Sequence, residues 1–114
     1  MQLTELTAIS PIDGRYGARL NNLKEIFSEF GLIKNRVKVE VFWLRMLANH
    51  PGISEVPKLS EQAEQHLLKL VDEFSIEMAQ RVKEIERTTN HDVKAVEYLI
   101  KEHFSDNKEL NAIS

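Results

Sequence analysis

The stretch that decides the fold runs from Ser60 to Ile85 and reads SEQAEQHLLKLVDEFSIEMAQRVKEI. Its apolar residues recur in steps of three, four or one over about six turns, which is the period of an amphipathic helix. They are Ala63, Leu67, Leu70, Val71, Phe74, Met78, Val82 and Ile85. Ser60 is a suitable N-cap, and Glu61 suits the positive first turn of a helix. The stretch therefore predicts one long helix.

The chain before this stretch follows the same period. An apolar stripe runs from Leu20 to Phe30, and after Gly31 a second run begins. Residues 37–41 alternate like a strand, but steps of four, four and three join the apolar residues of this run into a helical row. The row is Ile33, Val37, Val41 and Leu44, and a second row beside it is Val39, Trp43 and Leu47. We expect a long, deeply buried helix, and apolar residues on more than one face, such as Phe42, suggest a subunit contact.

A fourth helix is expected to begin at about His91 or Asp92, because the preceding pattern stops at residues 87–90. Its predicted buried row is Val93, Val96, Ile100 and Phe104. Residues 105–107, which read Ser-Asp-Asn, would form its terminating turn. The predicted fold class is thus all-α, with about four helices and no sheet.

Length and composition limit the class of protein. The 114 residues suffice for a single domain over residues 1–114 with one core of modest stability, but not for a large enclosed active-site cavity. Fifteen Lys and Arg against 18 Asp and Glu give a net charge of -3, which does not favour a nucleic-acid partner. The absence of cysteine excludes disulfide scaffolds, thiolate zinc sites and cysteine nucleophiles.

Targeting and membrane signals are not apparent in the sequence. The N-terminal residues carry an acid and no basic segment, and no apolar run approaches the roughly 18 residues of a spanning helix. We expect a cytoplasmic protein with no membrane partner. The sequence halts at Ser114 without a capping glycine or a polar tail, as an excised domain would.

The first candidate site is the loop that reads SPIDGRYG over residues 10–17. Its proline and two glycines predict a tight, exposed turn that presents Arg15 and Tyr16. An arginine offers a rigid fork of donors that matches a phosphate or carboxylate, and the phenol adds a hydrogen bond. The alternative is an ordinary turn in which Arg15 pairs with a surface acid.

The second candidate site is the segment RTTNHD over residues 87–92. A helix N-terminus can bind an anion, and His91 can donate, accept or titrate near neutral pH. Asp92 would cap the helix or orient the imidazole. The alternative is that Thr89 or Asn90 is the N-cap and Asp92 occupies the first turn, an arrangement that serves helix stability alone.

Metal and cofactor sites are not predicted. The other histidines, His50, His66 and His103, lack the spacing of metal ligands. The chain has no glycine-rich dinucleotide or phosphate loop and no Gly-x-Ser-x-Gly nucleophile elbow.

Together the two loops resemble the N-terminal region of the bacterial adenylosuccinate lyase family, which is part of the fumarase/aspartase superfamily. The resemblance rests on SPIDGRY at residues 10–16 and ERTTNHDVKAVEY at residues 86–98, in this order and with helices of matching length between them. It implies an all-α N-terminal domain followed by a central helical bundle and a C-terminal domain, assembled as a homotetramer without a cofactor. The implied reaction belongs to purine and AMP biosynthesis: fumarate is eliminated from adenylosuccinate, giving AMP, and from succinylaminoimidazole carboxamide ribotide.

The resemblance also implies roles for individual residues. Arg15 and Tyr16 would bind the nucleotide phosphate, and Asn90, His91 and Asp92 would line the substrate pocket. His91 would either take part in proton transfer or position the substrate. In the superfamily the catalytic base is a serine and the acid a histidine, both from the later domains. The 114 residues thus contain no certain catalytic residue, and we expect them to be inactive alone.

Two alternatives remain at this point. Other lyases of the superfamily, of the argininosuccinate lyase or fumarase type, act on substrates without a nucleotide phosphate, so a phosphate-binding Arg15 and Tyr16 would disfavour them. A non-catalytic helical interaction module would need only the apolar stripes, and the two polar loops would then be turns.

Overall fold

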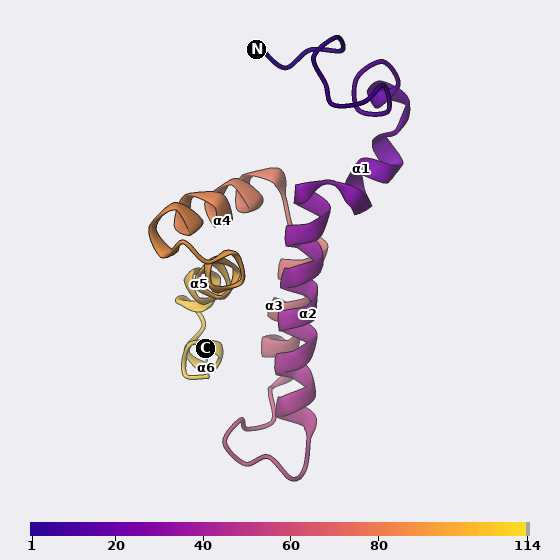
Figure 1. Cartoon of the computed structure of the whole chain (residues 1–114). Coiled ribbons are helices and arrows are strands. Elements are labelled where there is room, and N and C mark those ends of the chain that lie inside the picture. Colours follow the sequence, from indigo (N-terminus) through magenta and orange to yellow (C-terminus); the bar gives the residue numbers. More distant parts are fainter. Residues whose placement is uncertain (114) are drawn as a thin grey trace. The chain divides into compact units, whose positions relative to one another are not determined.

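The computed structural model describes residues 1–113, and their regular structure is entirely helical (Figure 1). This confirms the all-α class. The elements are the 3-10 helix η1 (Gly17–Arg19) and the α-helices α1 (Asn21–Phe27), α2 (Glu29–Asn49), α3 (Glu61–Asp72), α4 (Ile76–Thr89), α5 (Asp92–Phe104) and α6 (Lys108–Asn111). The chain divides into two compact units, an N-terminal unit of Met1–Leu32 and a C-terminal unit that begins at Ile33.

Turns and backbone hydrogen bonds build the N-terminal unit. The carbonyl of Ser10 accepts from the N–H groups of Asp13 (3.2 Å) and Gly14 (3.0 Å), so the predicted tight loop is present. Gly14 is required by a close approach, because a Cβ there would lie 2.5 Å from the carbonyl oxygen of Glu5. The helix α1 that follows buries none of its seven residues.

The first helical break falls at Ser28 and not at Gly31. Ser28 has an extended backbone (φ -75°, ψ 169°), and its hydroxyl accepts from the N–H of Gly31 at 3.1 Å. Gly31 itself lies inside α2, where a Cβ would clash with the carbonyl oxygen of Ile26. The glycine therefore permits a close backbone approach and does not end a helix.

The single long helix predicted from Ser60 to Ile85 is wrong, because the chain turns a corner after α3. The N–H of Glu73 bonds to the carbonyl of Lys69 (2.9 Å), and the hydroxyl of Ser75 caps α4 by accepting from Met78 N–H at 3.3 Å. Phe74, inside the corner, stays buried. The apolar row continues across the turn, so its spacing is that of one helix although two are present. With the short α6, which the sequence analysis did not predict, residues 1–113 form six α-helices instead of about four.

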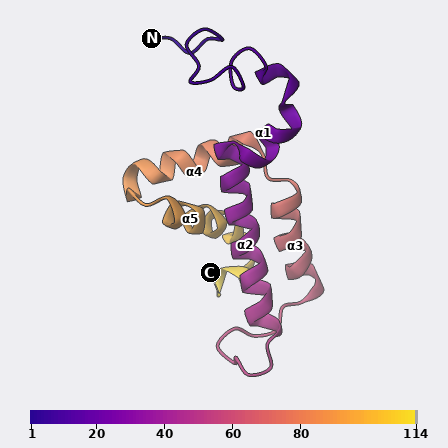
Figure 2. The same ribbon diagram turned by 45° about the vertical axis from the view of Figure 1, so that its right-hand side comes forward.

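The hydrophobic core belongs to the C-terminal unit. In Figures 1 and 2, α2 and α3 lie side by side, and α4 and α5 form a helical hairpin. The largest side chains with almost no exposed surface come from α2 to α6: Phe104, Leu67, Leu99, Leu110, Val37, Val41, Val82 and Val96. Burial of such side chains is worth roughly 1.5–3 kcal/mol each, which makes this core the main source of stability.

Polar contacts join the ends of these helices. Arg81 of α4 donates two hydrogen bonds to the carboxylate of Glu102 in α5, at 3.2 and 2.6 Å. Ser60, the predicted N-cap of α3, accepts from Ala63 N–H at 3.2 Å, which confirms that prediction. Its N–H and hydroxyl also donate to Glu109 of α6, both at 2.7 Å, and so tie α6 to the start of α3.

The helix α2 is less buried than predicted. Its row Ile33, Val37 and Val41 is buried, but Val39 and Trp43 of the second row are exposed. In α5 the predicted Val93 is exposed too, and the helix buries Ala95, Val96, Leu99, Ile100 and Phe104. None of the described helices combines the length and apolar character needed to cross a bilayer.

Candidate functional site

A sharp reversal joins α4 to α5 at Asn90. Its backbone is left-handed (φ 55°, ψ 26°), and its N–H bonds to the carbonyl of Glu86 at 2.7 Å. Asparagine tolerates this conformation better than most residues, which explains why the helix ends here. Asn90 is therefore the C-cap of α4 and not the N-cap of α5.

His91 is the N-cap of α5. Its backbone is extended (φ -145°, ψ 114°), and its Nδ1 accepts from the N–H of Lys94 at 3.2 Å. Thr89, which we predicted as an alternative N-cap, instead holds the backbone of His91. The Thr89 hydroxyl accepts from the N–H of His91 at 3.3 Å and donates to its carbonyl at 3.2 Å. The predicted start of the helix is confirmed, but the capping residue is different.

Asp92 fixes the start of α5 to α2. One carboxylate oxygen accepts from Val93 N–H at 2.8 Å, and the other forms an ion pair with Arg36 at 2.9 Å. The Val93 hydrogen bond, followed by the positive charge of Arg36, lowers the pKa of this carboxyl. Asp92 Oδ1 lies 4.0 Å from His91 Nδ1, too far for a hydrogen bond. The Lys94 N–H, and not Asp92, orients the imidazole.

The first loop presents a free cation. Arg15 and Tyr16 are exposed, and the guanidinium carbon lies 5.2 Å from the centre of the Tyr16 ring. Both residues line a hollow of about 390 Å³ in the N-terminal unit. Within residues 1–113 no carboxylate pairs with Arg15, so the alternative of a surface ion pair is not observed. A guanidinium with unused donors, stacked on a phenol, is suited to binding an anion.

The site residues thus fall into two groups. Arg15 and Tyr16 lie together in the N-terminal unit, and Asn90, His91 and Asp92 lie together at the α4–α5 turn of the C-terminal unit. Sequence reasoning missed Lys94 and gave Thr89 a different role, that of an N-cap, whereas both residues hold His91 through the hydrogen bonds above. These roles are hard to predict from the sequence, because hydrogen bonds that involve the backbone are compatible with many residue types.

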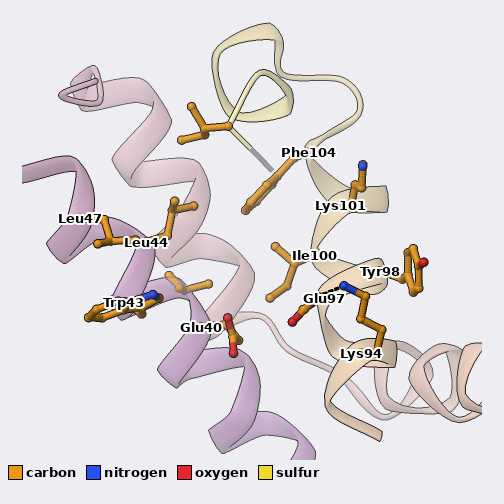
Figure 3. Close-up of a pocket in the computed structure, with 12 residues that line it drawn as sticks. Glu40, Trp43, Leu44, Leu47, Lys94, Glu97, Tyr98, Ile100, Lys101 and Phe104 are labelled. Atoms are coloured by element: carbon orange, nitrogen blue, oxygen red, sulfur yellow. Dashed lines mark hydrogen bonds and ion pairs between the residues drawn. The ribbon is translucent and has the colours of Figure 1, made fainter. Parts of the chain in front are cut away.

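A cavity of about 400 Å³ lies between α2 and α5 (Figure 3). It is lined by Glu40, Val41, Trp43, Leu44, Leu47, Lys94, Glu97, Tyr98, Ile100, Lys101, Phe104 and Ile113. Lys94 and Glu97 form an ion pair at 2.7 Å on its α5 wall. No predicted site residue lines it, although Lys94 also joins His91 through its backbone. Within residues 1–113 no three side chains cluster as metal ligands would.

No protein-family model matches the chain. Comparison with individual proteins finds relatives in several bacteria that carry the same name. Adenylosuccinate lyase of Escherichia coli (strain K12) is 55% identical over 114 residues, which is 100% of this chain and 25% of that protein. The Haemophilus influenzae enzyme of the same name is likewise 55% identical over 114 residues. That of Legionella pneumophila (strain Corby) is 46% identical over 112 residues, or 98% of the chain.

The chain matches the N-terminal region of adenylosuccinate lyases over its full length. The resemblance predicted from the two polar loops is thereby confirmed, and it extends to the helices between them. The chain spans about a quarter of the length of these relatives.

Proposed function

We propose that this chain is the N-terminal domain of an adenylosuccinate lyase of purine biosynthesis. The parent enzyme would eliminate fumarate from adenylosuccinate to give AMP, and from succinylaminoimidazole carboxamide ribotide. The observation that carries the proposal is the 55% identity to the Escherichia coli enzyme along all 114 residues. Identity of this extent covers both polar loops and the helices that hold them.

In this proposal Arg15 and Tyr16 bind the phosphate of the nucleotide. Support comes from the unpaired guanidinium, its stacking on the Tyr16 ring and the hollow that both residues line. A guanidinium fork binds two phosphate oxygens at once, which an ammonium cannot do with the same geometry. The superfamily lyases whose substrates lack a phosphate would gain nothing from this pair.

In the same proposal Asn90, His91 and Asp92 line the part of the substrate pocket that the C-terminal unit contributes. Asn90 and His91 have exposed side chains and would contact the substrate. The carboxylate of Asp92 is already engaged with Val93 N–H and Arg36, so Asp92 acts as a positioning residue for the turn.

The chemical step needs groups from outside these 114 residues. Elimination requires a base for the carbon-bound proton and an acid for the leaving nitrogen, both within hydrogen-bond reach of the substrate. We therefore propose that the isolated chain is inactive and that the parent is a cytoplasmic homotetramer. The exposed apolar residues of α2, including Phe42, Trp43 and Met46, support further helical contacts in the parent.

A chimera tests the proposal. The matching quarter of the Escherichia coli enzyme is replaced by this chain, and fumarate release from adenylosuccinate is measured. We expect turnover in the chimera and none in the chain alone. Arg15→Ala should cost about 2–3 kcal/mol of substrate binding, which is roughly a 30- to 150-fold loss of kcat/KM. Arg19→Ala, an exposed arginine of the same unit, is the matched control and should change little.

The outcome distinguishes the proposal from a non-catalytic helical module. A folded tetrameric chimera without turnover would contradict the lyase assignment. Equal turnover of the Arg15→Ala and Arg19→Ala chimeras would contradict the phosphate-binding role alone.

A further inference from the structure

The helix α2 has two apolar faces, and within residues 1–113 only one of them is covered. The covered face is the buried row that begins at Ile33. On the other face Val39 is 65%, Phe42 42% and Met46 62% exposed. We call these three residues the α2 seam. The core of the C-terminal unit is thus built from one side of α2, and a second apolar side of the same helix remains open.

The spacing of the α2 seam indicates what kind of element fits it. Val39, Phe42 and Met46 follow steps of three and four residues, and the exposed Asn35 and Asn49 continue these steps at either end. Such steps form a narrow stripe that a second helix covers when it runs along the first at a small crossing angle. An extended peptide or a membrane surface does not require this spacing. The seam therefore fits a helix.

The positions beside the seam indicate the charge of that helix. They contain no acidic residue and read Arg36, Lys38, Trp43 and Arg45. Charges at such flanking positions determine which helices pair with one another. A helix with Asp or Glu beside its apolar stripe complements these cations, whereas a second copy of α2 presents no acid at the same positions.

Two of these cations lie close to the seam and lack a strong partner. Lys38 Nζ and the guanidinium carbon of Arg45 lie 5.6 and 5.7 Å from the centre of the Phe42 ring. Within residues 1–113 no carboxylate pairs with Lys38. Arg45 Nε has no hydrogen-bond partner there, only a contact of 3.5 Å with an oxygen of Glu64. Both side chains can therefore pair with carboxylates of a covering helix.

We propose that the α2 seam is covered in the parent protein by a helix that lies beyond these 114 residues and carries acidic side chains beside an apolar stripe. The inference rests on the proposed function, because it takes this helix from the parent enzyme. The chain spans about a quarter of the length of its relatives, so most of the parent is available to supply the helix. Trp43, which is 54% exposed and adjoins the seam, becomes covered with it.

Trp43 reports directly on the covering, because it is the only tryptophan of the 114 residues. In the chimera described above, its fluorescence is obtained by subtracting the signal of the Trp43→Phe chimera. We expect acrylamide to quench this fluorescence several-fold less efficiently than that of Trp43 in the isolated chain. Equal quenching in the two proteins would overturn the proposal. The measurement needs no turnover, so a folded chimera without activity would contradict the proposed function and still report whether the seam is covered.

The charge of the covering helix is tested by two matched variants. Lys38→Glu and Lys58→Glu make the same change at exposed lysines, one beside the seam and one in the loop between α2 and α3. In the isolated chain their unfolding equilibrium constants should differ by less than about twofold. In the chimera Lys38→Glu should melt about 2–4 °C below Lys58→Glu, and high salt should reduce the difference. An equal or higher melting temperature of Lys38→Glu would overturn the acidic character of the helix.

Val39→Glu separates this occupant from the others. The isolated chain should remain monomeric at all concentrations in sedimentation and should not bind phosphatidylserine vesicles, with or without this substitution. A dimer that forms with rising concentration and is abolished by Val39→Glu would overturn the proposal in favour of a second copy. Vesicle binding that is abolished by Val39→Glu would overturn it in favour of a membrane surface.

Discussion

The two units of the chain differ in what holds them together. Every buried apolar side chain lies at or after Ile33, whereas the buried residues of the first 32 are Gly14, Gly17 and Gly31. Most large apolar residues of the N-terminal unit are exposed, and two, Leu20 and Phe30, are half-buried. The exposed ones are Met1, Leu3, Leu6, Ile9, Ile12, Tyr16, Leu23, Ile26, Phe27 and Leu32. The comparison teaches that apolar residues on a helical stripe make a core only where a second element covers them.

The difference has an energetic consequence. The helix α1 has only seven residues and no buried face, so it is marginally stable on its own. The free-energy cost of nucleating a helix exceeds the stabilisation that so few hydrogen bonds provide. The C-terminal unit buries large side chains and has capped helices. We therefore expect the C-terminal unit to carry the cooperative unfolding of the chain.

The largest expected effect comes from a matched pair of phenylalanines. Phe104 is fully buried, and Phe104→Ala should cost about 3–5 kcal/mol of the free energy of unfolding, measured in urea. Phe27 is 80% exposed, and Phe27→Ala should change the free energy of unfolding by no more than about 0.5 kcal/mol. Similar losses in the two variants would contradict the contrast between the units.

The corner between α3 and α4 predicts a smaller effect. Ser75→Ala removes the hydroxyl that accepts from Met78 N–H and should cost about 1 kcal/mol in the same measurement. Ser75→Asp preserves an acceptor at the N-terminus of α4 and serves as the control. If Ser75→Ala proved as stable as Ser75→Asp, the helix would not begin at this cap.

A pH effect is expected from Glu109. The hydroxyl and then the N–H of Ser60 bond to its carboxylate and lower its pKa from the usual 4.5. A lowered folded-state pKa gives stability that is present above pH 4.5 and is lost as the pH falls through the folded-state value. The melting temperature should thus fall below about pH 4.5, and less steeply in Glu109→Gln. If the melting temperature depended on pH in the same way in the original chain and in Glu109→Gln, the result would contradict this contact.

The smallest effect should come from removing most of the N-terminal unit. A chain of residues 28–114 keeps Ser28 and the start of α2. Its free energy of unfolding should stay within about 0.5 kcal/mol of that of the full chain. A loss of several kcal/mol would mean that residues 1–27 share the core.

Sequence reasoning recovered the parts of the fold that depend on local chemistry. The caps and breaks at Ser60, residues 87–92 and residues 105–107 all mark real boundaries. It failed at Phe74, because periodicity does not distinguish a straight helix from a corner that keeps the same residues inside. It also failed at Trp43, because a stripe shows which residues share a face but not what covers that face.

The candidate site was recovered in part for the same reason. Arg15 and Tyr16 carry their chemistry in their residue types, and a tight loop exposes them as predicted. The capping role of His91 was missed, since histidine is not among the preferred N-cap residues. That role depends on the left-handed turn at Asn90 and on the hydroxyl of Thr89, which are features of the folded chain.

Amide hydrogen exchange of the 114-residue chain, resolved by residue, tests the central claim most directly. The account predicts strong protection in α2 to α5 after Ile33, with the slowest amides opening only on global unfolding, and rapid exchange throughout residues 1–27. Protection of α1 equal to that of α5 would contradict it, because the N-terminal unit would then share in the cooperative core.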